Sequence, residues 1–93
     1  MEAFPTDPAE QLRAEKMLLL KADSDIEQGW KRLRNQQELL LELEAAGHDT
    51  TQAGRLVQLL QHTLVEWERH RTLIEERVNY LEQKSLPETL RKS

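Results

Sequence analysis

The sequence contains no cysteine. Disulfide frameworks, zinc sites built from thiolates and cysteine nucleophiles are therefore excluded. Glycine and proline occur only three times each, and aromatic residues make up 4% of the chain, whereas an all-β domain needs many turns. Few turn residues combined with 32% charged residues are typical of long helices whose outer sides contact water. The composition therefore favours an all-α fold.

Long apolar stretches are also missing, because the longest uninterrupted one covers only residues 17–20. A helix needs about 20 apolar residues to span a bilayer, so we expect no association with a membrane. The N-terminal residues lack the basic and apolar regions of a secretory signal. These observations together predict a cytoplasmic protein.

A first long helix is predicted over residues 7–46, after a loose leader at residues 1–6. Asp7 can cap its start, Pro8 suits the first helical position, and Glu10 completes an arrangement like a capping box. Leucine or isoleucine then recurs at every seventh position from Leu12 to Leu40. Such a repeat is typical of a seam between two coiled helices.

A tight turn is predicted at Gly47, His48 and Asp49. Gly47 suits the left-handed conformation that ends many helices, and Asp49 can cap the next helix. A second helix should follow over residues 50–84, with apolar residues alternately four and three positions apart, and residues 85–93 should form a tail. The two helices must therefore fold back on each other as an antiparallel coiled-coil hairpin.

Folding the chain about His48 predicts which residues share the core. Gly29 falls beside Trp67, where a missing Cβ would leave room for the indole ring. Arg71 falls in the seam, and its charged head is expected to reach Asp25 or Glu27. The predicted core residues are Leu19, Ile26, Trp30, Leu33, Leu40, Leu60, Leu64, Trp67 and Ile74.

Further leucines flank the seam near residues 18–20, 39–41 and 56–60, so the apolar surface is wider than one neighbouring helix can cover. We expect a homodimer in which two hairpins form a four-helix bundle. A different helical protein is the alternative partner. The predicted interface residues are Leu18, Leu20, Leu39, Leu41, Leu56, Leu59 and Leu73.

Three residues on the second helix are candidate metal ligands. His62, Glu66 and His70 are spaced four and four and form one stripe, but the two histidines are about 12 Å apart along the helix axis. One ion cannot easily bridge that distance, so a solvated stripe with local Glu–His pairs is the favoured interpretation, and a metal-responsive regulator is an alternative function.

No catalytic residues are expected, so we predict that the chain is not an enzyme and uses no cofactor.

One basic cluster, formed by Lys31, Arg32 and Arg34, could contact nucleic acid. The net charge of the whole chain is −4, and acidic residues surround the cluster. Binding to duplex nucleic acid usually requires a basic surface, since most of the affinity comes from contacts to phosphates. A nucleic-acid-associated protein is therefore an unfavoured alternative.

Residues 26–74 resemble a group of short, uncharacterised bacterial helical-hairpin proteins. The resemblance is carried by the Gly-His-Asp-Thr turn at residues 47–50, by the surrounding glutamates and leucines, and by the His70-Arg71 pair. Trp30 and Trp67 depart from the pattern of that group. The group has no established activity, so the resemblance implies a helical hairpin and assigns no functional residue. The wide leucine faces, and not this resemblance, predict a non-enzymatic interaction or assembly module.

Overall fold

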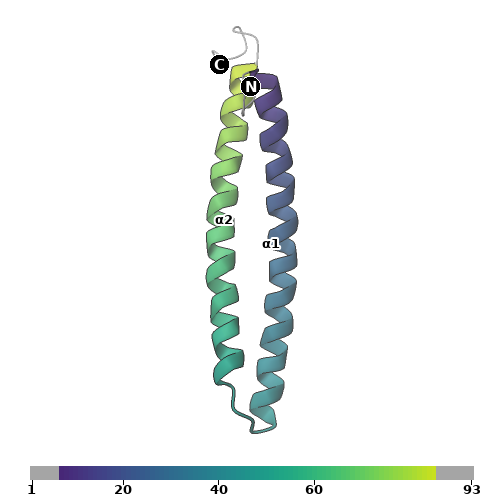
Figure 1. Ribbon diagram of the computed structural model, residues 1–93, viewed down its shortest axis with the longest axis vertical. Coiled ribbons are helices and arrows are strands. Elements are labelled where there is room, and N and C mark those ends of the chain that lie inside the picture. Colours follow the sequence, from purple (N-terminus) through teal and green to yellow (C-terminus); the bar gives the residue numbers. More distant parts are fainter. Residues whose placement is uncertain (1–6, 86–93) are drawn as a thin grey trace, which may run out of the picture.

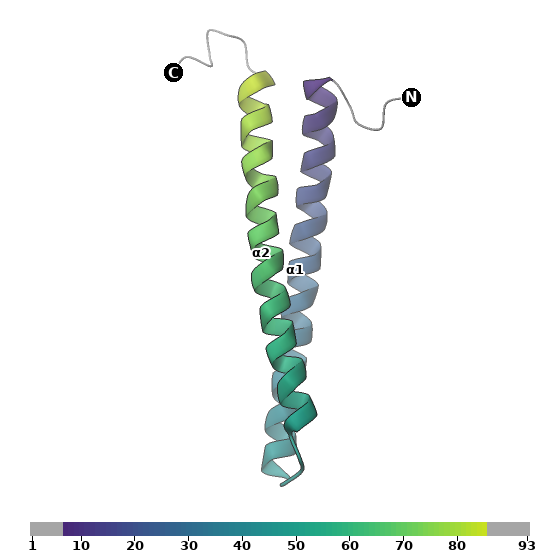
Figure 2. The same cartoon turned by 60° about the vertical axis from the view of Figure 1, so that its left-hand side comes forward.

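The computed structural model, which describes residues 7–85, consists of two antiparallel helices that lie side by side (Figure 1). Helix α1 spans Pro8–Ala45 and helix α2 spans Thr51–Ser85. A view from another side shows the same pairing along the whole length of the hairpin (Figure 2). The predicted all-α hairpin is therefore confirmed. The predicted leader, and the predicted tail beyond Ser85, lie outside the described residues.

Side chains and a glycine define the ends of the helices. The Asp7 carboxylate accepts a hydrogen bond from the Ala9 backbone N–H at 3.1 Å, so α1 begins directly after its cap. At the other end of α1, Gly47 has a φ of 74°. The backbone N–H groups of Gly47 and His48 then donate to the carbonyls of Glu44 and Leu43, at 3.1 and 2.9 Å. These bonds satisfy carbonyl groups that the helix itself leaves without partners.

The start of α2 depends on Asp49. Its Oδ1 accepts hydrogen bonds from the Thr51 backbone N–H at 3.0 Å and from the Thr51 hydroxyl at 2.7 Å. These bonds hold the pKa of the Asp49 carboxyl below its ordinary value of 3.8, the backbone bond contributing most. The helix begins at Thr51, one residue after the predicted start.

The core is a narrow line of side chains between the helices. A central cluster contains Leu33, Val57 and Leu64, with Ile26, Leu40 and Leu60 packed against it. Ile74, Val78 and Leu81 are buried nearer the free ends of the hairpin. Among the predicted core residues, Leu33, Leu64 and Ile74 are buried, and Leu19, Ile26, Leu40 and Leu60 are half-buried.

The prediction that both tryptophans belong to this core is wrong for the single hairpin. Trp30 is 41% exposed and Trp67 is 38% exposed. Trp30 follows Gly29, so its side chain points about 100° away from the line of contact. Trp67 does lie on that line, beside Gly29 as expected, but two helices cover only part of so large a ring.

Candidate helix interface

The hairpin has two different sides, which are separated by the residues along the contact line between the helices. We call these the seam residues: Leu12, Glu15, Leu19, Ala22, Ile26, Gly29, Leu33, Gln36, Leu40 and Leu43 on α1, and Ala53, Val57, Leu60, Leu64, Trp67, Arg71, Ile74, Val78 and Leu81 on α2. Each residue is rotated about 100° from the preceding one. The residue before a seam residue therefore lies on one side of the hairpin, and the residue after it lies on the other.

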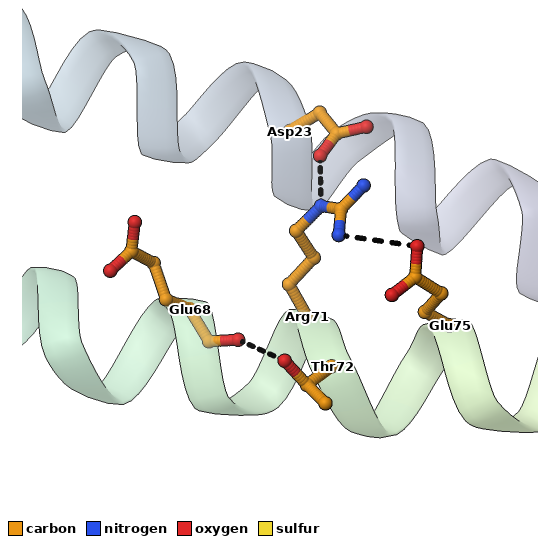
Figure 3. A network of polar contacts seen from close by, with 5 residues as sticks. All are labelled: Asp23, Glu68, Arg71, Thr72 and Glu75. Carbon is orange, nitrogen blue, oxygen red and sulfur yellow. Dashed lines mark hydrogen bonds and ion pairs between the residues drawn. The ribbon is translucent and has the colours of Figure 1, made fainter.

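Residues that follow seam residues form a charged side, which we call the ion-pair face. Lys16 of α1 pairs with Glu82 of α2 at 3.4 Å. The Nε–H of Arg71 donates to the Asp23 carboxylate across the helices, and its terminal nitrogen lies 3.5 Å from Glu75 (Figure 3). The hydrogen bond with Asp23 is the main reason that the pKa of Arg71 is raised above its ordinary value. The pairs Lys16–Glu82 and Arg71–Asp23 connect the two helices on this face.

The expected partners of Arg71 were Asp25 or Glu27, and this prediction is wrong. Asp25 precedes the seam residue Ile26, so it lies on the other side of the hairpin, where it accepts a 2.8 Å hydrogen bond from Lys21. Glu27 pairs with Lys31 on the same helix at 3.6 Å. Asp23 follows a seam residue and is therefore on the side that the Arg71 guanidinium reaches.

Residues that precede seam residues form the opposite side, which we call the groove face. A first groove of about 230 Å³ is lined by Leu18, Lys21, Ala22, Asp25, Trp67, His70 and Ile74. A second groove of about 500 Å³ is lined by Gln11, Ala14, Glu15, Leu18, Arg77, Tyr80 and Leu81. Because Leu18 lines both, the two grooves adjoin. They occupy the half of the hairpin nearest its free ends.

All seven leucines of the predicted interface are exposed in the single hairpin. They do not share one side, however. Five precede seam residues and lie on the groove face: Leu18, Leu39, Leu56, Leu59 and Leu73. Leu20 and Leu41 follow seam residues and lie on the ion-pair face. The groove face also exposes Tyr80, which sequence reasoning missed although it precedes the regular seam residue Leu81.

Glu15 is a second residue of the groove that sequence reasoning missed. It occupies a seam position between Leu12 and Leu19, where the repeat would place an apolar side chain. The Arg77 Nε–H donates to Glu15 Oε1 at 2.9 Å, whereas Glu15 Oε2 is buried without a hydrogen-bond partner. The only signal in the sequence was the seven-residue repeat itself.

The other candidate sites do not come together. His62, Glu66 and His70 are exposed on α2, and residues 7–85 contain no group of three side chains placed to hold a metal ion. Arg32 and Arg34 lie on opposite faces, because one precedes and the other follows the seam residue Leu33. The predicted basic cluster is therefore divided between the two sides of the hairpin.

Comparison of the chain with protein-family models, with curated proteins and with solved structures found no match. The resemblance of residues 26–74 to bacterial helical-hairpin proteins thus stays a prediction. In the described part of the chain, neither helix has an apolar stretch that is long enough to cross a bilayer.

Proposed function

We propose that the chain is a non-enzymatic protein–protein interaction or assembly module that acts through its apolar helix faces. Its first partner is a second copy of the same chain, and the product is a four-helix bundle. One observation carries the proposal: the described chain buries six apolar residues but leaves twelve large apolar side chains exposed.

Burial of such side chains would stabilise an assembly substantially. Complete burial of one leucine contributes about 1.5–3 kcal/mol, so burial of several leucines from each copy offsets the loss of freedom on association, which costs about 4–15 kcal/mol. The exposed residues run along the helices on either side of a narrow seam. A second pair of helices is the partner whose shape fits such a surface, since bundles form when each helix contacts more than one neighbour.

Light scattering during size-exclusion chromatography tests the proposal, together with circular dichroism. We expect a highly helical species with twice the 10.9 kDa mass of the chain. Its thermal midpoint should rise with protein concentration, because association stabilises only the folded state. A stable, highly helical monomer with a concentration-independent midpoint would overturn the proposal.

A further inference from the structure

We infer that the groove face, and not the ion-pair face, binds the second copy, and that the two copies lie with their turns at the same end. This inference rests on the proposed self-association. It adds which surface is used and how the two hairpins are oriented.

The distribution of apolar side chains favours the groove face. The exposed large apolar residues that precede seam residues are Leu18, Leu39, Leu56, Leu59, Leu73 and Tyr80. Those that follow seam residues are Leu20, Trp30, Leu41 and Val65. The two adjoining grooves also give the groove face concave sites between the helices, into which side chains of a second hairpin can insert.

The distribution of charge favours the same face. Among residues beside the seam, the groove face carries three cations and three carboxylates: Lys21, Arg32 and Arg77, with Asp25, Glu42 and Glu66. The ion-pair face carries three cations and six carboxylates: Arg13, Lys16 and Arg34, with Asp23, Glu27, Glu44, Glu68, Glu75 and Glu82. Arg71 adds a fourth cation to the ion-pair face, and Glu15 adds a fourth carboxylate to the groove face. The ion-pair face therefore stays more acidic by one charge, and two ion-pair faces repel each other more than two groove faces do.

Matching residues across the interface determines the orientation. A two-fold axis parallel to the hairpin places α1 of one copy over α2 of the other at the same level. Within one hairpin, Gly29 lies at the level of Leu64, and Asp23 lies at the level of Arg71. By the same register, Leu39 would face Leu56 of the second copy, an apolar pair, and Asp25 would face His70.

Arg32 and Glu66 extend this match to the middle of the interface. Arg32 forms no ion pair within residues 7–85, and Glu66 forms an ion pair with Arg69 of the same helix, at 3.3 Å. With the turns together, Arg32 of one copy and Glu66 of the other come within about one helical turn of each other, a distance that both side chains can bridge. The two-fold axis makes this contact twice.

The reversed orientation matches less well. A two-fold axis across the hairpin places α1 of one copy over α1 of the other. The two helices then run in opposite directions, and their middles coincide. Leu18 would then face Asn35 of the second copy, and Arg32 would face Lys21. A leucine faces a polar side chain in both orientations, because with the turns together Leu59 would face Asn35. The like-charge pairing of Arg32 with Lys21 occurs only in the reversed orientation, which is therefore disfavoured.

The groove face is large enough for a stable dimer. At 1.5 Å per residue, the 38 residues of α1 extend over about 57 Å, and two adjacent helices are about 20 Å wide. The face therefore covers on the order of 1,000 Å² per copy, whereas a standard interface buries about 800 Å² from each partner.

Two matched leucines test which face is used. Leu59 lies on the groove face and is 61% exposed. Leu41 lies on the ion-pair face and is 65% exposed, and both leucines are in the half of the hairpin nearest the turn that joins the helices. Leu59→Glu should weaken dimerisation at least about 100-fold, since a buried charge enters the interface twice. Leu41→Glu should leave the dimer affinity within a few-fold of wild type. Glutamate is a good helix former, so both variants should retain their helical circular dichroism.

The outcomes separate the inference from the proposed function. A wild-type monomer would refute self-association itself. A wild-type dimer that Leu41→Glu dissociates, or that Leu59→Glu leaves intact, would leave self-association standing and overturn the choice of face. Analytical ultracentrifugation measures all three affinities.

Distances between spin labels test the orientation. The described chain, like the full sequence, has no cysteine, so Arg55→Cys and Arg69→Cys each introduce one labelling site on the outer side of α2. With the turns together, electron spin resonance should give similar label distances across the dimer for both variants. In the reversed orientation, the two labels at residue 55 would lie about 40 Å apart along the hairpin axis, because residue 55 is far from the middle of α2. Residue 69 is close to that middle, so the label distance at residue 55 would exceed the label distance at residue 69 by roughly 20 Å. That result would overturn the orientation while leaving the dimer itself intact.

Discussion

A Cβ atom at Gly29 would lie 2.7 Å from Cδ2 of Leu64, which is closer than two carbon atoms can pack. Leu64 is 2% exposed, so its side chain has little room to move away. The same Cβ would also lie 3.2 Å from Cζ3 of Trp67. The close approach of the helices at this level therefore requires a residue without a side chain on α1.

Gly29→Ala should destabilise the hairpin although alanine is the better helix former. The gain in helix propensity is about 1 kcal/mol, and overpacking of a tight contact costs about 1–3 kcal/mol. We expect a net loss of about 1 kcal/mol in the free energy of unfolding. Urea titration followed by circular dichroism, at one fixed protein concentration, measures the change.

Gly54 provides the matched control. It also lies in a helix, but a Cβ there would meet nothing within 4 Å. Gly54→Ala should therefore stabilise the chain by about 0.5–1 kcal/mol. If both substitutions stabilised it equally, the contact between Gly29 and Leu64 would not limit the packing.

The fold could be predicted because its signals are local and repeated. The seven-residue repeat identifies the seam, and Gly47 and Asp49 end one helix and start the next by contacts with residues close to them in sequence. The burial of the tryptophans could not be predicted in the same way. A repeat tells where Trp67 points, but the exposure of the ring depends on how much of it a second helix can cover.

The two faces of the candidate interface were less accessible to sequence reasoning. Leu18, Leu19 and Leu20 read as one apolar run, yet Leu18 and Leu20 lie on opposite sides of the seam residue between them. The contact of Arg71 with Asp23 depends on the register of α1 against α2, which the position of the turn gives only to within a few residues. Glu15 was missed because the repeat was traced through its apolar members, and a polar residue at a seam position is not one of them.

The positive φ of Gly47 makes a prediction about the turn. Gly47→Ala should lower the free energy of unfolding by about 1–2 kcal/mol, because a Cβ disfavours the left-handed conformation. Gly47→Asn should cost clearly less, since asparagine tolerates that conformation better. No atom lies within 4 Å of a Cβ at this position, so a larger side chain meets no steric conflict. Equal losses in the two variants, measured by urea unfolding, would contradict a backbone origin.

The hydrogen bonds to Asp49 make the stability depend on pH. Because its pKa is lowered in the folded chain, the carboxylate stabilises the fold above its ordinary pKa of 3.8, and this contribution is lost as the pH falls through the lower, folded value. Asp49→Asn keeps a capping side chain but has no charge to lose. Wild type should therefore be more stable than Asp49→Asn at neutral pH, and the difference should disappear in acid. A difference that stays constant from neutral pH to acid, measured by thermal unfolding, would show that the charge is not responsible.

Replacement of the seam carboxylate should stabilise the hairpin. Glu15→Leu removes the buried Oε2 atom that lacks a partner, which relieves about 1–3 kcal/mol, and it removes an ion pair with half-exposed Arg77 that contributes about 0–1 kcal/mol. We expect the free energy of unfolding to rise by about 1 kcal/mol, and Glu15→Gln, which keeps a polar side chain in the seam, to give no such gain. Both changes are best measured by urea unfolding in the Leu59→Glu background, where association is weakened and the helices unfold largely as single hairpins. A lower stability for Glu15→Leu than for its parent would mean that the pairing with Arg77 outweighs the cost of burying the carboxylate.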